Sequence, residues 1–354
     1  MFSIHIQNFF QIILYSGLTF LLTVSVFPHF IEFVQKYKLT QKIRDEDMGG
    51  KVAKIFAKLH AHKAGTPTMG GAVIVCTVLV VVVISRVLSY FGVVDSSLLN
   101  RGETYLPIFT FACVGILGII DDYLNITERS KQKGLSARIK LWSLVGFALL
   151  GAIWFFFKLE YSSIHVPAVG DFEIGLLYIP LFVFVVVGSA NAVNFTDGLD
   201  GLAGGLSAIA FAVFGVIAYA YELPILATFC FIVVAAIIAF LWFNVPPASV
   251  FMGDAGSLPL GATIGVIVMM TDSIFVWMVV CLVFGIETLS VIMQLFSKKF
   301  FKRKIFLVAP IHHHFEAKGW SETQITMRFW ILGGVVGMLG LILGLVGMGE
   351  KGLF

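Results

Sequence analysis

Five aspartates lie at the ends of long apolar stretches in a chain that carries few charges: Asp121, Asp122, Asp197, Asp200 and Asp254. An ionised carboxylate at the edge of a hydrocarbon layer is costly to desolvate. Several of them on one side of a membrane therefore indicate a site that binds a cation or performs phosphate chemistry with one. Oxygen ligands of this kind suit Mg²⁺.

The adjacent pair Asp121 and Asp122 follows directly after an apolar run that ends at Ile120. Two like charges a few ångströms apart repel each other unless a cation or a basic side chain neutralises them. The pair therefore favours Mg²⁺ or a basic partner, and the loop that follows carries Lys131 and Lys133. The alternative is a simple polar stop at the end of a helix.

A second polar cluster joins two apolar spans at residues 191–205 with almost no loop. Its side chains recur at every third position: Asn191, Asn194, Asp197 and Asp200. In a helical continuation these groups would lie near one another, and the glycines that follow would let a ligand approach the backbone closely. Helix capping is the alternative, but capping explains one aspartate and not four polar side chains.

The third polar segment, at 244–257, begins with Asn244 and contains two successive prolines. Prolines forbid a regular helix here, so the segment presents Phe251 and Asp254 at the membrane surface. A phenylalanine beside a carboxylate suits stacking on a flat ring. The alternative is an aromatic anchor at the membrane interface.

Three successive histidines, His312, His313 and His314, form the last polar motif. Adjacent side chains do not readily turn toward one metal ion, so a zinc site is only weakly indicated. The four cysteines fall in apolar spans without metal-ligand spacing, and we expect them to be small buried residues. The histidines are better suited to contacting phosphate oxygens or orienting carboxylates. Upstream, Lys63 precedes a Gly- and Pro-containing segment that could face a phosphate.

The elements that must position these residues are membrane spans. Of the 354 residues, 58% are hydrophobic and 13% charged, whereas soluble domains have about 25% charged residues. We predict an all-α, polytopic membrane protein with a single transmembrane domain over residues 1–354. About ten apolar runs can serve as spans; they cover residues 10–35, 70–91, 105–120, 141–159, 176–191, 202–220, 224–243, 255–271, 273–296 and 328–348.

The lysines and arginines predict the orientation, because short basic loops stay in the cytoplasm. With the N-terminus outside, 20 of the 24 basic residues fall on the inside. Both termini then face the periplasm, and all five aspartates lie in or beside cytoplasmic loops. The predicted cytoplasmic loops are 36–69, 121–140, 191–201, 244–254 and 297–327.

Two further segments suggest contacts with the membrane or with another helix. Residues 51–59 have the pattern of a short amphipathic helix on the anionic inner leaflet, although ordinary enrichment of basic residues inside explains them equally well. The last span carries a stripe of glycines at three- and four-residue spacing, between Gly333 and Gly347. Such a stripe allows close helix packing, either within the chain or in a homodimer.

Taken together, the motifs resemble the phospho-N-acetylmuramoyl-pentapeptide transferase family, within the polyprenyl-phosphate N-acetylhexosamine-1-phosphate transferase superfamily. The resemblance covers the whole chain. It rests on GTPTMGG at 65–71, the aspartate pair, NAVNFTDGLDGLAGG at 191–205, FMGDAG at 251–256 and APIHHHFE at 309–316. The aspartate motifs are shared across the superfamily. The triple histidine points to the muramoyl-pentapeptide branch rather than to enzymes that transfer N-acetylglucosamine phosphate.

The resemblance implies a Mg²⁺-dependent enzyme of the bacterial inner membrane, with its active site facing the cytoplasm. The implied reaction moves phospho-N-acetylmuramoyl-pentapeptide from UDP-N-acetylmuramoyl-pentapeptide to undecaprenyl phosphate, giving lipid I and UMP in peptidoglycan synthesis. The implied partners are these two substrates and membrane lipid, with no nucleic acid, and a homodimer is favoured.

The resemblance also implies roles for individual residues. Asp254 is the expected metal ligand, and Asp121, Asp122 and His312 are the other expected catalytic residues, the two aspartates as base or as metal and phosphate contacts. Phe251 would stack on uracil in a uridine pocket shared with Leu199, Asp200 and Asn244. The remaining substrate-binding candidates are Lys63, Lys133, Asn191, Asn194, Asp197, His313 and His314.

The charges of the reacting phosphates limit the possible mechanisms. A phosphate monoester has a second pKa of about 6, so the lipid phosphate is largely dianionic at neutral pH and needs no strong base. Bringing two anions together is harder, which favours a metal with lysines as the main catalytic factor. We therefore predict direct attack on the β-phosphate, with a phospho-aspartate at Asp121 or Asp122 as the alternative.

Three other functions compete with this one. A transporter could use its carboxylates to bind cations, but acids gathered at one membrane face count against a midplane site. A lipid-binding scaffold would need the same groups without turnover. Within the enzyme class, the rival is a transferase that uses UDP-N-acetylglucosamine.

Overall fold

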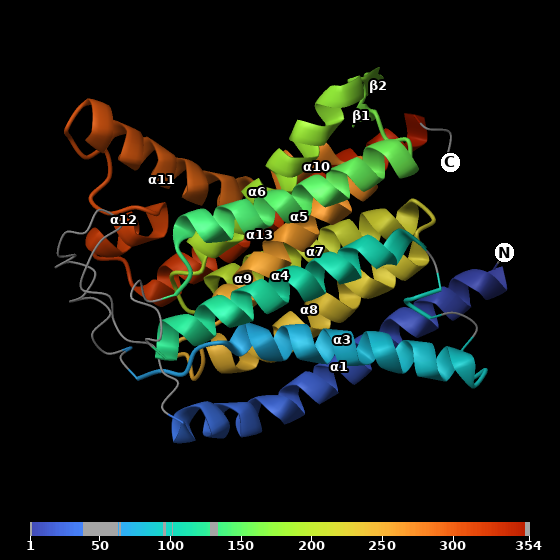
Figure 1. Ribbon diagram of the computed structural model, residues 1–354, viewed down its shortest axis with the longest axis horizontal. Coiled ribbons are helices and arrows are strands. Elements are labelled where there is room, and N and C mark those ends of the chain that lie inside the picture. Colours follow the sequence, from blue (N-terminus) through green and yellow to red (C-terminus); the bar gives the residue numbers. More distant parts are fainter. Residues whose placement is uncertain are drawn as a thin grey trace.

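The computed structural model describes residues 2–37, 63, 65–94, 97–100, 102–127 and 134–350, and most of them are helical (Figure 1). The long helices are α1 (Phe2–Lys36), α3 (Gly70–Tyr90), α4 (Gly102–Thr127), α5 (Ala137–Lys158), α6 (Tyr178–Thr196), α7 (Leu202–Ala220), α8 (Pro224–Asn244), α9 (Asp254–Met270), α11 (Leu282–Phe300) and α13 (Glu322–Glu350). The shorter elements are β1 (Ser163–Val166), β2 (Gly170–Glu173), η2 (Gly175–Leu177), α10 (Ile274–Val280) and α12 (Ile311–Ala317).

The predicted all-α membrane architecture is confirmed. Among the described residues, eight helices are long and apolar enough to cross a membrane. The run expected at 255–271 is α9, which has only 17 residues. Its residues from Ala255 to Met269 are all buried, because α4 and α6 pack along it. This short central helix therefore begins inside the protein, with Asp254 as its first residue.

The span expected at 273–296 is not one continuous helix. That stretch forms α10 and α11, which are bent by 78° at a break around Cys281. In α11, Glu287, Ser290, Gln294 and Ser297 share one buried face. The end of this face lies on the segment after the helix, where Gln294 Nε2 donates to Phe306 O at 2.8 Å and Ser297 Oγ to Arg303 O at 2.9 Å.

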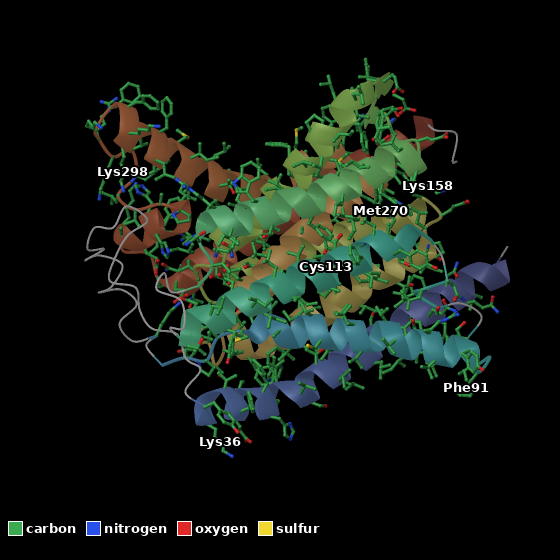
Figure 2. All side chains as sticks on the ribbon, viewed as in Figure 1. Lys36, Phe91, Cys113, Lys158, Met270 and Lys298 are labelled. Carbon is green, nitrogen blue, oxygen red and sulfur yellow. The ribbon has the colours of Figure 1, made fainter. Side chains whose placement is uncertain are left out.

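The two ends of the bundle differ. The start of α1 and the end of α13 lie at one end, together with the antiparallel β1–β2 hairpin, whereas α12 lies at the opposite end (Figure 1). Figure 2 labels Lys36 and Lys298 at the α12 end, and Phe91 and Lys158 at the other. The alternating course of the chain brings the ends of α4 and α6 and the start of α9 to the α12 end, which is the arrangement that a one-sided site requires.

The glycine stripe of α13 packs within the chain. A Cβ at Gly333 would lie 2.5 Å from Leu206 Cδ2 of α7, and one at Gly340 would lie 2.4 Å from Val280 Cγ2 of α10. Close approach of these helices uses the stripe, so the stripe gives no support to a homodimer. The amphipathic segment expected at 51–59 lies outside the described residues.

The cysteines correct one expectation. Cys230 and Cys281 are buried as predicted, but Cys113 is only partly buried and Cys76 is exposed. All four are free thiols. Cys76 lies on the outward face of α3, where a hydrocarbon environment suits a small apolar side chain as well as a protein core does.

Candidate active site

Three carboxylates meet at the α12 end of the bundle. Asp121 and Asp122 lie near the end of α4, and Asp254 begins α9; one ligand oxygen from each lies within 4.8 Å of the others. Gly118 allows this meeting, because a Cβ there would lie 2.2 Å from the backbone oxygen of Asp254. The close contact of α4 with the start of α9 brings together acids that are more than a hundred positions apart.

Backbone N–H groups hold two of these carboxylates in place. Asp122 accepts hydrogen bonds from the N–H groups of Asp254 at 3.2 Å and Ala255 at 3.0 Å, at the N-terminus of α9. The partial positive charge of a helix N-terminus stabilises an anion in this position. Asp121 accepts from the N–H of Leu135 at 2.6 Å. The orientation of both acids is therefore set before any ligand binds.

Lys140, in the first turn of α5, bridges the cluster. Its Nζ lies 3.0 Å from Asp121 Oδ2 and 2.8 Å from Asp254 Oδ2. Three carboxyl groups face one lysine, so the cluster has carboxyl oxygens left to offer a cation. The donor set is oxygen-only, as Mg²⁺ prefers. Among the described residues it is the one group of three or more acidic, His or Cys side chains with the spacing of a metal site.

Asn194 and Asp197 extend the cluster from the end of α6. Asn194 Nδ2 donates to Asp254 Oδ1 at 2.8 Å and to Ser257 Oγ at 2.9 Å. Asp197 Oδ2 accepts from the N–H of Gly253 at 3.2 Å. Burial raises the pKa of Asp197 to about 7, and the nearby Asp254 carboxylate adds to the rise while the Gly253 N–H opposes it.

The helical continuation expected through Asp200 is wrong. Helix α6 ends at Thr196, so the four polar residues do not share one face. Asn191 donates to Val187 O within its own helix at 2.8 Å. Asp200 instead lies on the far side of the turn, where its carboxylate meets Lys63.

Lys63 and Asp200 define a second polar region beside the carboxylates. Lys63 Nζ lies 2.7 Å from Asp200 Oδ1, and Lys63 also pairs with Glu322 in the first turn of α13. The other oxygen of Asp200 accepts from the N–H of Ala248 at 3.0 Å. Lys63 Nζ also lies 5.7 Å from the centroid of the Phe251 ring. A partly exposed aromatic ring, a cation and a carboxylate thus share one small region.

Asn244 and Leu199 support the Lys63–Asp200–Phe251 region. Asn244 Oδ1 accepts from the N–H of Gly201 at 2.9 Å, and its Nδ2 donates to Val250 O at 2.8 Å, so one side chain ties two loops together. Leu199 is buried. Phe251 is fixed through its backbone, since its N–H donates to Pro67 O at 2.9 Å and its carbonyl accepts from Gly70 at 2.8 Å. The expected 65–71 segment therefore positions the aromatic ring.

The histidines separate into two kinds. His312 and His313 are buried and face Gly198, in the turn after α6. His314 is partly exposed, and its Nδ1 accepts from the N–H of Leu307 at 3.1 Å. His314 thus holds the preceding loop and lies apart from the other two imidazoles. Lys133 falls outside the described residues.

Sequence reasoning did not single out two site residues, Lys140 and Glu322, or the buried acid Glu287. Lys140 is one of the predicted cytoplasmic basic residues, and it follows the aspartate pair on the next helix. Glu322 carried no motif. Glu287 is the one acid in the apolar run 273–296, and that isolation was the available signal, because a lone ionisable group in a span is a functional candidate.

The fold and this site define a polytopic membrane protein with an acid-rich centre, of a kind that could hold a metal ion, at one end of its helix bundle. The family model of Glycosyl transferase family 4 matches residues 104–272, which run from α4 to the end of α9. This matched stretch contains all five aspartates singled out in the sequence.

Relatives that match nearly the whole chain identify the family more closely. The chain is 37% identical to the phospho-N-acetylmuramoyl-pentapeptide-transferase of Chloroflexus aurantiacus, over 97% of this chain and 92% of the relative. It is 39% identical to the protein of that name from Bacillus anthracis, over 93% and 96%. For Geobacillus thermodenitrificans the identity is 38%, over 93% and 97%. The chain belongs to the phospho-N-acetylmuramoyl-pentapeptide-transferase family.

Proposed function

We propose that this protein transfers phospho-N-acetylmuramoyl-pentapeptide from its UDP carrier to undecaprenyl phosphate, releasing UMP and forming lipid I. The observation that carries the proposal is the adjacency of two regions: the carboxylate cluster of Asp121, Asp122 and Asp254, and the Lys63–Asp200–Phe251 region. The first suits reacting phosphates and the second suits a uracil ring with polar edges.

The nucleoside would bind at the second region. The partly exposed Phe251 ring offers a stacking face, and Lys63 and Asp200 offer a donor and an acceptor for the polar edge of a pyrimidine. Asn244 and Leu199 would act by holding the loops that form this pocket. The donor phosphates would then extend toward Asn194, Asp197 and the carboxylates.

The carboxylate cluster would hold Mg²⁺, with Asp254 as the principal ligand and Asp121 and Asp122 beside it. When bound, the ion would supply positive charge to the phosphates of the donor. Lys140, which bridges Asp121 and Asp254, has a flexible stem and could turn its ammonium from the acids to a phosphate oxygen. The residues thereby reduce the repulsion between two anionic substrates.

The proposed chemistry is one direct displacement. An oxygen of the lipid phosphate forms a bond to the β-phosphorus of the donor, and the bond from that phosphorus to the bridging oxygen breaks, so UMP leaves with the electron pair. No general base is required, because the lipid phosphate is largely dianionic at neutral pH. Incubation with donor alone, followed by intact-protein mass spectrometry, tests this step: a chain that has gained the mass of the phospho-N-acetylmuramoyl-pentapeptide group, with UMP released, would contradict it.

The site is proposed to face the cytoplasm of a bacterial inner membrane, where the soluble UDP donor is present. A homodimer is proposed from the family resemblance alone, and crosslinking in native membranes tests it.

The donor is tested by measuring UMP release from purified protein with Mg²⁺ and undecaprenyl phosphate. We expect release with UDP-N-acetylmuramoyl-pentapeptide and none with UDP-N-acetylglucosamine. Release only with the second donor would overturn the proposal.

A further inference from the structure

Glu287 is a buried carboxylate that the mechanism above does not use. It lies in α11 and is 0% exposed, although the same helix presents Leu289, Ile292 and Phe296 outward. Burying a carboxylate costs several kcal/mol unless it is paired and hydrogen-bonded. A group retained at such a cost within an apolar helix is expected to have a specific partner.

That partner is His312 on α12. Glu287 Oε2 lies 3.0 Å from His312 Nδ1, and the His312 side chain is also 0% exposed. A carboxylate at Nδ1 accepts its proton, which fixes both the tautomer and the orientation of the ring. The opposite ring nitrogen, Nε2, is then available to interact with the group that it faces.

Nε2 of His312 faces Gly198. Within the described part of the chain it has no hydrogen-bond partner. A Cβ at Gly198 would lie 2.3 Å from His312 Nε2 and 3.2 Å from His313 Nε2, so only glycine permits this approach. The facing residue is the neighbour of Asp197, in the turn where the donor phosphates are proposed to bind.

The second imidazole has the same construction. His313 Nδ1 lies 2.5 Å from Glu316 Oε2, and its ring centroid lies 4.1 Å from that of His312. Two neighbouring rings are therefore each held by a carboxylate at Nδ1 and turned with Nε2 toward one glycine. The repetition favours a built arrangement over the incidental burial of one acid.

We propose that Glu287 is a positioning residue for the transfer reaction. It acts through His312, by holding Nδ1 protonated and directing Nε2 at the 197–198 turn. The bend between α10 and α11 serves this role, because it places the buried face of α11 over α12. This inference rests on the proposed function, since the consequence of positioning is measured as turnover.

The kinetic test compares Glu287→Gln, His312→Gln and the double variant. Gln keeps the shape of Glu but removes its charge, and loss of such an outer partner typically costs about 10- to 100-fold in activity. We expect that loss in kcat with little change in KM for the UDP donor. The double variant should be no slower than His312→Gln alone. If the two losses in kcat multiply, so that the double variant is slower than His312→Gln alone, the proposal is overturned.

Ser290→Ala is the matched control. Ser290 is buried one turn along α11 from Glu287, and its Oγ donates to the backbone oxygen of Glu287. We expect near-normal turnover. A loss equal to that of Glu287→Gln would show that any buried polar change in α11 disturbs the enzyme, and would overturn the positioning role.

A spectroscopic test needs no turnover. In protein with ¹⁵N-labelled histidine, the signal that disappears in His312→Gln should report a proton on Nδ1, and Glu287→Gln should shift it. A wild-type His312 protonated only on Nε2 would contradict the proposal. If neither UDP donor yields UMP, the proposed function fails, while this measurement still decides whether Glu287 orients His312.

Discussion

Lys140 Nζ lies 2.8 Å from Asp254 Oδ2, joining the first turn of α5 to the first residue of α9. The same ammonium lies 3.0 Å from Asp121 Oδ2, so one lysine neutralises part of a three-carboxylate cluster. This relationship links stability to ion binding, since both the lysine and a divalent cation would compensate the same charges.

Lys140→Met should destabilise the protein most strongly when divalent cations are removed. Each charged hydrogen bond lost contributes about 2 kcal/mol, and the acids would be left to repel one another. We expect a lower thermal unfolding midpoint in EDTA and a smaller difference from wild type when Mg²⁺ is added. Lys158→Gln, at the other end of α5, is the control and should leave both midpoints unchanged. Equal midpoints for Lys140→Met and wild type in EDTA would contradict the compensating role.

Asp254→Asn should abolish turnover while preserving the fold. Asn keeps the side-chain size and the contact with Asn194 but removes the charge proposed to hold Mg²⁺. We expect UMP release to fall by at least about 100-fold, and Mg²⁺ to lose its stabilising effect on the unfolding midpoint. Asp272→Asn, just beyond the other end of α9, is the comparison and should retain Mg²⁺-dependent activity. Normal UMP release by Asp254→Asn would exclude Asp254 as the principal ligand.

Phe251→Ala should weaken binding of the UDP donor. Stacking of a base on an aromatic ring contributes about 1–3 kcal/mol, which corresponds to an increase of at least about 5-fold in KM. We expect kcat to change less than KM, and Phe251→Trp to recover most of the affinity. A change confined to kcat would place Phe251 outside the nucleoside pocket.

Asp197 should make stability depend on pH. Its pKa is raised from 3.8 to about 7 in the folded protein, so the folded state binds a proton that the unfolded state has released. Between about pH 4 and pH 7 the unfolded state therefore binds fewer protons, and the free energy of unfolding falls as pH rises. We expect the unfolding midpoint without divalent cations to decline over this range in wild type and to decline less in Asp197→Asn. Parallel pH profiles of the two proteins would contradict this assignment.

The membrane bundle was predictable because a hydrocarbon solvent leaves a direct signature in composition. The bend at Cys281 was not, since neither proline nor glycine stands at the break. Beyond the break, the polar side chains Glu287, Gln294 and Ser297 find their hydrogen-bond partners in residues later in the chain. Hydrophobicity alone does not encode a partner that arrives from elsewhere.

The aspartates were predictable as a set, because charge at span ends is rare and all five fell on one predicted face. The division of the aspartates between two regions was less predictable. Asp254 meets Asp121 and Asp122, whereas Asp200 lies across the turn after Thr196, where its carboxylate pairs with Lys63 and its backbone N–H donates to Glu322. The three-residue spacing suggested one helical face, but α6 ends before that face is complete. Lys140 and Glu322 lack motif neighbours, so only the three-dimensional structure assigns them to the site.

The proposed reaction is the transfer of a phospho-sugar to a lipid phosphate at the carboxylate cluster. The most direct test is mass spectrometry of the lipid fraction after purified protein, Mg²⁺, UDP-N-acetylmuramoyl-pentapeptide and undecaprenyl phosphate have reacted. We predict one new lipid, whose mass is that of undecaprenyl phosphate plus UDP-N-acetylmuramoyl-pentapeptide less UMP, formed in equal amount to UMP and absent with Asp254→Asn. UMP release without this lipid, or the same lipid formed at an undiminished rate by Asp254→Asn, would contradict the proposed transfer at this cluster.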